Sequence, residues 1–168
     1  MSTHFANPDE PYTTVTPQTI RELVASADNA PLRRARLCLH SGPDDPLHEM
    51  IIAFRRDSYV APHRHLGKSE SFHVIEGEIE VVFFDDHGAV TSRLVLSAAH
   101  PASPRVYRLR AACWHTVIVR SDWAVIHETT NGPFRPVETE TAPWAPAAQD
   151  AAAVADFFLH LNASPSPT

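Results

Sequence analysis

The fold is decided by residues 62–77, whose sequence is PHRHLGKSESFHVIEG. His63 and His65 stand two positions apart, and side chains two apart on an extended strand project from the same face. Four residues, one of them a glycine, then lead to Glu70. This spacing predicts a turn that brings Glu70 back on the adjacent strand, so that its carboxylate and the two imidazoles can share one metal ion.

His115 lies in a second strand-like segment, where it shares a face with Val117 and Val119. That face is expected to point inward, but spacing alone leaves open whether His115 is a ligand or a core histidine. Imidazole nitrogens with one carboxylate suit iron, manganese, nickel, zinc, cobalt or copper, and affinity alone does not separate these ions. The predicted cofactor is therefore one divalent transition metal ion of undetermined identity.

Composition limits the class of protein. A chain of 168 residues fits a single domain, since domains most often contain roughly 100–150 residues. The formal net charge of −6 and a pI near 6.0 argue against a nucleic-acid partner or an anionic membrane partner. Cys38 and Cys113 are too few for a disulfide framework, and neither a signal peptide nor a membrane-spanning apolar run is visible. We expect a cytoplasmic protein.

The N-terminal region, residues 1–31, is predicted to contain an arm and a helix. Residues 1–15 are polar, so we expect them to be poorly ordered, or a strand only if a partner subunit orders them. Thr16 suits the N-cap position of a helix and Pro17 suits its first turn.

Residues 32–134 are predicted to form an all-β barrel with about eight or more strands. Short β-type segments separated by turns, with no long helices between them, are typical of a sandwich or barrel. The predicted segments are 32–40, 47–55, 58–65, 70–76, 78–85, 90–96, 105–109, 114–120 and 123–129. Residues 135–168 are rich in proline and alanine and are predicted to form a tail with a terminal helix.

Arg36 and His40 are candidates for substrate binding. They share one face of their segment with Arg34 and Cys38, because side chains alternate along a strand. Arginine suits planar, bidentate recognition of carboxylate or phosphate. The alternative is that this face is exposed to solvent or to another subunit.

Glu128 and Lys68 are candidates for catalysis. Glu128 stands near the end of a predicted strand and could act as a general acid or base. Lys68 lies in the loop between His65 and Glu70, where it could donate to a substrate. Pairing of Lys68 with Glu49 or Glu76, or a simple surface charge, is the alternative.

These patterns resemble the cupin superfamily, small β-barrels whose first motif is Gly-x5-His-x-His-x3-4-Glu-x6-Gly and whose second is Gly-x5-Pro-x-Gly-x2-His-x3-Asn. The matching positions are His63, His65, Glu70 and Gly77 for the first motif and His115 for the second. The resemblance therefore implies that residues 32–134 form a cupin-like barrel of the jelly-roll type, with a metal site made of His63, His65, Glu70 and His115. The departures from the motifs are Asp57, Arg110, Ala112 and Val119. They affect turns rather than ligands and weaken the second motif more than the first.

A closer resemblance is to the WbuC-type cupin-fold metalloproteins, over roughly residues 32–146. The similar segments are RARLCLH at 34–40, PHRH at 62–65, KSESFHVIEG at 68–77, WHT at 114–116 and HETTNGPF at 127–134. This resemblance implies a role connected with bacterial surface polysaccharides, and together with the apolar terminal helix it favours a homodimer.

Three functions fit these observations. The first is a metal-dependent enzyme that acts on a small polar substrate, such as a sugar derivative, by isomerase, epimerase or lyase chemistry. The second is an iron(II)-dependent oxygenase, in which open coordination positions accept oxygen and substrate. The third is a non-catalytic module that senses a metal or a sugar.

Overall fold

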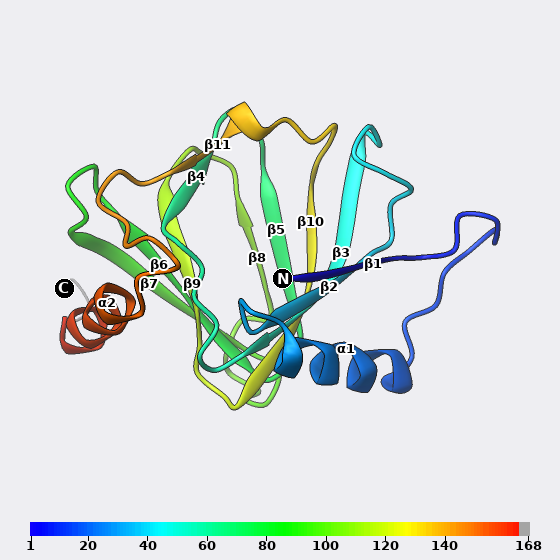
Figure 1. The fold of residues 1–168 in the computed structure, drawn as a ribbon, viewed down its shortest axis with the longest axis horizontal. Coiled ribbons are helices and arrows are strands. Elements are labelled where there is room, and N and C mark those ends of the chain that lie inside the picture. Colours follow the sequence, from blue (N-terminus) through cyan, green and yellow to red (C-terminus); the bar gives the residue numbers. More distant parts are fainter. Residues whose placement is uncertain (165–168) are drawn as a thin grey trace.

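The computed structural model describes residues 1–164, and their strands form two facing sheets (Figure 1). The strands are β1 (Ser2–Phe5), β2 (Arg34–Cys38), β3 (Leu47–Arg55), β4 (His63–His65), β5 (Glu70–Glu76), β6 (Glu78–Phe84), β7 (Val90–Ser97), β8 (Val106–Leu109), β9 (Trp114–Val119), β10 (Trp123–Asn131) and β11 (Thr139–Thr141). The helices are α1 (Pro17–Asn29), α2 (Ala151–Ala163) and the 3-10 turn η1 (Pro136–Glu138). One sheet has the order β1-β2-β3-β10-β5-β8 and the other β11-β4-β9-β6-β7. The predicted all-β fold with a helix near each end is confirmed.

Helix α1 covers the outer face of the six-stranded sheet (Figure 1). Thr16 caps it by accepting a hydrogen bond from the Thr19 backbone N–H, and Pro17 opens the first turn, as the sequence predicts. Its Ile20, Leu23 and Ala27 are buried against small and aliphatic residues of the sheet, namely Ala35, Ile51, Ala53 and Val125. Burial of this apolar face stabilises the helix on the sheet.

Helix α2 covers the outer face of the five-stranded sheet (Figure 1). Its Phe157, Phe158 and Leu161 pack on Val82, Phe84, Trp114 and Ile118 of the sheet. Neither α helix of the described residues has the length and apolar composition that a membrane crossing needs.

An ion cluster, here called the outer cluster, joins the C-terminal end of α2 to the same sheet. It consists of Glu80, Arg93 and Arg120. Glu80 accepts hydrogen bonds from Arg93 Nη1 at 3.2 Å and from Arg120 Nε at 3.0 Å. Arg93 Nη2 also donates to the Leu161 carbonyl at 2.5 Å, and Arg120 Nη1 donates to Asn162 at 2.8 Å. The two arginines therefore bond to both the sheet and the last turn of the helix.

The main core lies between the two sheets, where alternate strand residues meet. At one end it is aliphatic, with Ile79, Val81, Leu96 and Ile126 fully buried. Gly77 connects β5 to β6 at a φ of +76°, and a side chain there would collide with the backbone of Trp123. The other end of the interior is polar and contains the candidate site.

The N-terminal residues differ from the expectation of a poorly ordered or partner-ordered arm. Ser2–Phe5 forms β1, which pairs in parallel with β2 of the same chain. Without β1, strand β2 would be a sheet edge with unpaired backbone groups, so this pairing satisfies them. Thr3 also accepts a hydrogen bond from Arg36 Nε at 3.2 Å.

The predicted strand 58–65 is shorter in the structure, where only His63–His65 pairs as β4. Proline lacks a backbone N–H donor for the ladder, and Pro62 stands directly before this strand. Both sides of β4 are occupied, by β9 and by β11.

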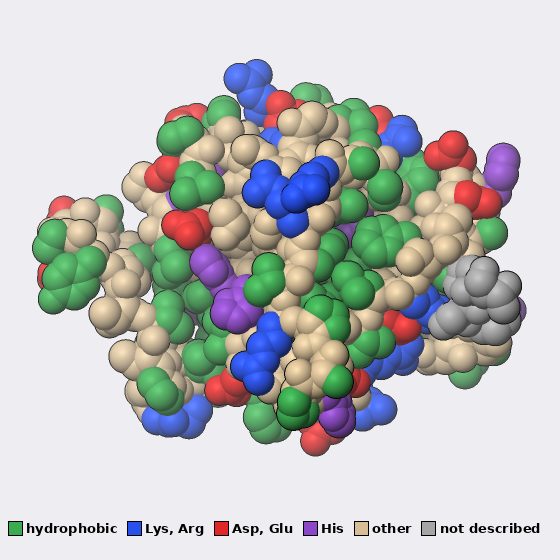
Figure 2. Space-filling model, turned by 180° about the vertical axis from the view of Figure 1, so that it is seen from behind, with side chains coloured by type: hydrophobic (Ala, Val, Ile, Leu, Met, Phe, Trp, Pro, Cys, Tyr) green, Lys and Arg blue, Asp and Glu red, His purple; other side chains and the backbone are tan. Residues whose placement is uncertain are grey.

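Positive and negative side chains are interspersed over the face shown in Figure 2.

Candidate metal centre

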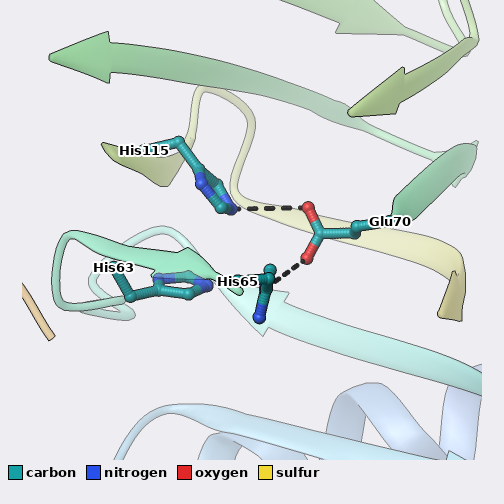
Figure 3. Close-up of side chains that lie close together, drawn as sticks. All are labelled: His63, His65, Glu70 and His115. Carbon is teal, nitrogen blue, oxygen red and sulfur yellow. Dashed lines mark hydrogen bonds and ion pairs between the residues drawn. The ribbon is translucent and has the colours of Figure 1, made fainter. Parts of the chain in front are cut away.

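Four side chains converge at the polar end of the interior (Figure 3). His63 and His65 come from β4, His115 from β9 and Glu70 from β5. One ligand atom of each lies within 4.8 Å of those of the other three. His63 and His115 face each other as a cross-strand pair, and their rings are 4.4 Å apart. The structure thus brings together all four residues that were predicted as metal ligands.

Glu70 reaches the cluster by a different route from the one expected. Strand β5 is not adjacent to β4; it belongs to the six-stranded sheet, which faces β4 across the interior. Residues 66–69 carry the chain from one sheet to the other, and Gly67 has a φ of +70°, a conformation that favours glycine. The expectation of an adjacent strand was wrong because a short turn can join facing sheets as well as neighbouring strands.

The second nitrogen of each imidazole has a hydrogen-bond partner. His63 Nδ1 lies 2.9 Å from the Ala61 carbonyl, and His115 Nδ1 lies 2.9 Å from the Cys113 carbonyl. Because a carbonyl oxygen can only accept, Nδ1 carries the proton in both rings, and Nε2 presents a lone pair in the neutral form. His65 Nδ1 similarly lies 3.2 Å from Thr139 Oγ1. Such outer contacts orient metal-binding histidines.

Glu70 is 3% exposed and is held on both carboxylate oxygens. The Tyr107 hydroxyl donates to Oε1 at 2.8 Å, while His65 Nε2 lies 3.0 Å from Oε2. Burial alone would raise the pKa of Glu70, but the close contacts of the His115 and His65 imidazoles outweigh it and hold that pKa well below its usual range. The carboxylate is therefore ionised and available to a cation.

The pKa values of His63 and His115 shift in opposite directions. Burial, with the nearby charge of His115, lowers the pKa of His63 to about 4. Burial also lowers the pKa of His115, but its contact with Glu70 outweighs this and raises that pKa. His63 is thus neutral near pH 7, as a metal ligand must be. Without metal, His115 binds its proton more strongly than a free imidazole does, because the Glu70 carboxylate is close to it.

The donor set fits a transition metal ion. His115 is fully buried, and its Nε2 has no partner with hydrogen-bond geometry among residues 1–164, although Glu70 Oε1 is 3.4 Å away. An unpartnered polar atom in the interior is costly unless something binds it. Three imidazole nitrogens and one carboxylate are the ligand types of several divalent ions, and these donors do not select among them.

A cavity of about 360 Å³ opens beside the four side chains. Its lining includes His63, His65 and Glu70 together with Arg34 and Glu128. A second lobe of about 330 Å³ also contains His65 and Glu128 in its lining. Cavities of this size hold small molecules.

Glu128 lies on the interior face of β10, between Met50 and Phe72 of the flanking strands. No hydrogen bond or ion pair to its carboxylate occurs among the described residues. Burial, followed by the negative charge of Glu70, raises the pKa of Glu128 to about 8, although Arg36 and Arg34 oppose the shift. Glu128 therefore holds its proton at neutral pH, unlike Glu70.

The two candidate substrate-binding residues also line the second lobe. Arg36 lines both this lobe and the cavity beside His63, His65 and Glu70. The His40 ring stacks on His48 at 4.1 Å, and its Nδ1 contacts the Glu49 backbone at 3.0 Å. His40 is therefore a fixed part of the wall.

Lys68 lines the second lobe, but its charge is already neutralised. Its Nζ lies 2.9 Å from Glu138 and donates to the Pro133 carbonyl at 3.0 Å. The alternative of a pairing with Glu49 or Glu76 is not the one observed, because η1 brings Glu138 over the loop.

Two further residues at the site were not predicted, namely Tyr107 and Thr139. Tyr107 lies in a segment predicted as a strand, and strand parity could have indicated its inward face. Its contact with Glu70 depends on the register between β8 and β5, which the sequence does not show. Thr139 lies in β11, for which the tail gave no periodic signal.

Comparisons with known proteins support the fold. A family model described as a domain of unknown function, DUF6016, matches residues 15–96. The comparison with curated proteins finds no match. A crystal structure of CapF with the inhibitor 3-isopropenyl-tropolone is similar at 18% identity and a TM-score of 0.56, covering 67% of this chain and 32% of that one.

Two other solved structures are similar. The capsular polysaccharide assembling protein CapF of Staphylococcus aureus matches at 17% identity and a TM-score of 0.53, over 63% of this chain and 29% of that chain. A cupin superfamily protein, DSY2733 of Desulfitobacterium hafniense, matches at 14% identity and a TM-score of 0.45, over 58% and 76%. Of these neighbours, DSY2733 is the one whose description names the cupin superfamily.

The fold is cupin-like. This confirms the fold that the two histidine motifs predicted. The chain spans about a third of the CapF chains that it matches. At these identities the likeness shows the fold alone. The chemistry of the cupin-like barrel must be argued from its own side chains.

Proposed function

We propose that this protein is a metal-dependent enzyme that acts on a small polar substrate, such as a sugar derivative, by isomerase, epimerase or lyase chemistry. The observation that carries the proposal is the convergence of His63, His65, Glu70 and His115 beside a cavity that also contains Glu128. A non-catalytic metal site has no need of an accessible acid in the same cavity, and this combination therefore favours catalysis.

The four convergent residues would hold the ion, and Tyr107 and Thr139 would orient Glu70 and His65. When bound, the metal would supply a Lewis acid that polarises a carbonyl or hydroxyl oxygen. Glu128 would hold or receive the proton at its carboxylate oxygen, a role that suits a group whose pKa is raised to about 8. Arg36 and His40 would fix the substrate, while Lys68, paired with Glu138, would hold the loop that closes the lobe.

The wider setting is part of the proposal. The resemblance to WbuC-type proteins, together with a neighbour whose name refers to capsular polysaccharide assembly, supports a role connected with surface polysaccharides. We also propose a homodimer. Light scattering at micromolar concentration tests this, and a monomer would contradict it.

The test of the metal site compares His65→Ala with His73→Ala. His73 lies on β5, is exposed and is absent from the cluster, so it is a matched control. We expect His65→Ala to lose bound metal, measured by elemental mass spectrometry, and to lose turnover in a substrate screen. The His73→Ala protein should keep both. Normal metal content and turnover in His65→Ala would refute the proposal.

The screen also separates the competing functions. Oxygen uptake that depends on added iron(II) would replace the isomerase proposal with an oxygenase. A ligand that binds saturably without forming a product would favour the sensing module.

A further inference from the structure

Arg34 and Arg36 differ from the other half-buried arginines of the described chain. Each of those others has a carboxylate within 4.0 Å: Arg33, Arg55, Arg64, Arg93 and Arg120. For Arg34 and Arg36 there is no such carboxylate within residues 1–164. A cation withdrawn from water is costly unless an anion or several hydrogen bonds compensate it.

The contacts of the two guanidinium groups leave donors unused. Arg34 Nη1 reaches the Tyr59 carbonyl only at 3.4 Å, and Arg34 Nε is buried without a hydrogen-bond partner in the described part of the chain. Arg36 donates to Thr3 Oγ1, while its Nη1 lies 3.8 Å from the weakly accepting Met50 sulfur. Both side chains line the cavity beside His63, His65 and Glu70.

Glu128 does not neutralise this pair. It lines the same cavity, but strand β3 separates β10 from β2 in the sheet. Neighbouring strands lie about 4.8 Å apart, so two such spacings separate the backbones that carry Glu128 and Arg36. No ion pair joins their side chains within residues 1–164. Arg34 and Arg36, here called the arginine wall, therefore keep a positive charge that faces the cavity.

The chemistry of this wall favours a carboxylate over a phosphate. The Nε and Nη atoms of one guanidinium form a planar pair of donors that matches two oxygens of a carboxylate or of a phosphate, so the surroundings of the guanidinium groups decide between the two anions. Phosphate sites commonly use free backbone N–H groups at a helix N-terminus. Here the donors come from side chains of a strand in the sheet interior, and the cavity wall around them includes Ile52, Phe54 and Val60.

We propose that Arg34 and Arg36 bind the carboxylate of a small organic acid, whose other oxygen atoms face His63, His65 and Glu70. The substrate of the proposed enzyme is then an acid, such as a sugar acid or a hydroxy acid, rather than a neutral sugar. This inference rests on the proposed function for the identity of the neighbouring site, but the arginine contact itself requires no metal.

The test follows the Arg34 Nε–H signal by nitrogen-15 NMR in zinc-loaded protein. The probes are D-glucuronate and glycolate, each compared with its neutral amide, and inorganic phosphate. We expect both acids to shift the signal and the amides to leave it unchanged. No shift with either acid, or tighter binding of phosphate than of both acids, would overturn the proposal.

Variants give the second measurement. Arg34→Gln and Arg36→Gln should each raise the dissociation constant of the acid roughly 10- to 100-fold, the usual effect of losing a hydrogen bond to a charged group. Arg21→Gln, on the exposed face of α1, is the matched control and should not change it. Equal affinity in all three variants would overturn the proposal. If one variant fails to fold, the titration of the unaltered protein still decides.

Metal-free protein separates this inference from the proposed function. Zinc affinity is measured independently by calorimetry. If an acid shifts the Arg34 Nε–H signal in a protein that binds no zinc, the metal site is refuted and the carboxylate site is supported. Zinc binding without any arginine shift would refute the carboxylate site alone.

Discussion

On the outer face of the five-stranded sheet, Glu80 accepts hydrogen bonds from Arg93 and Arg120, whereas Glu128 inside the barrel makes no ion pair with Arg34 or Arg36. We call the second group the inner set. Both groups contain two arginines and one glutamate. Strand β6, which carries Glu80, lies directly beside β7 and β9, so its partners are adjacent. In the inner set, β3 separates the acid from the bases.

The difference shows how strand order decides what a charge does. In the outer cluster the charges neutralise one another and bond to the end of α2, which is a structural task. In the inner set the charges remain available, and burial raises the pKa of Glu128 rather than lowering it. The same residue types therefore serve stability in one place and, we propose, a ligand in the other.

The largest expected effect comes from Glu80→Gln. It leaves two arginines without their carboxylate, and Arg93 is only 8% exposed. Breaking a buried ion pair costs about 3–5 kcal/mol, so we expect a loss of that order in the free energy of unfolding, measured with urea. Glu128→Gln is the matched control and should not destabilise the protein near pH 7. Equal losses in both variants would remove the contrast between the two groups.

The second prediction concerns how the free energy of unfolding of the metal-free protein depends on pH. The pKa of Glu128 is raised from 4.5 to about 8, so the folded protein keeps this proton where the unfolded chain loses it. Stability of the wild type should therefore fall as pH rises through that window, and Glu128→Gln should not show this part of the fall. We expect a difference on the order of 2 kcal/mol, because each pKa unit corresponds to about 1.4 kcal/mol and cavity solvent reduces the effect.

Parallel urea titrations from about pH 5 to about pH 8 measure this difference. A constant gap between the two proteins over the whole range would show that Glu128 is already paired in the folded state, like Glu80.

The third prediction concerns Glu70, a second carboxylate inside the barrel. Unlike Glu128, it accepts a hydrogen bond from a neutral donor, the Tyr107 hydroxyl. Tyr107→Phe removes the hydroxyl that donates to Glu70 Oε1. Loss of such an orienting contact typically weakens metal binding roughly 10- to 100-fold, and we expect a value near the lower limit, measured by competition with a chelator. Tyr59→Phe is the control, since that hydroxyl donates to the Pro146 carbonyl instead. Unchanged affinity in Tyr107→Phe would mean that Glu70 needs no such support.

The smallest effect is expected for Arg120→Gln. Arg120 is 30% exposed, and Glu80 keeps Arg93 as its partner. We expect a loss of about 1 kcal/mol in the free energy of unfolding. Arg56→Gln removes a more exposed pair with Asp122 at 3.9 Å and should lose almost nothing. A loss in Arg120→Gln as large as that in Glu80→Gln would show that the outer cluster acts as one unit.

Much of this fold could be predicted from the alternation of its strand residues. The His-x-His spacing placed two imidazoles on one interior face, and the inward face of His115 followed from Val117 and Val119. Periodicity of two shows which face a residue occupies. It does not show which strand or sheet lies opposite, and this is why the position of Glu70 in the facing sheet was missed.

The remaining contacts depend on register and on distant segments. Tyr107 meets Glu70 through the pairing of β8 with β5, and Thr139 meets His65 through β11. Lys68 pairs with Glu138, which is far along the sequence. Such partners are selected by the folded topology, so no local pattern indicates them. Strand alternation placed the two arginine side chains on one face, but only the structure reveals that they lack carboxylate partners within residues 1–164.

The pairing of β11 with β4 has a consequence for how this protein can be shortened. Strand β4 has three residues, and its second edge is closed by Thr139–Thr141, with further bonds from Leu66 N to Glu138 O and from Ala142 N to Pro62 O. A chain cut after Phe134 would leave the edge of β4 open, and an open strand edge is a template for pairing with another molecule. Trimming the tail would therefore turn the strand that carries His63 and His65 into a surface for aggregation.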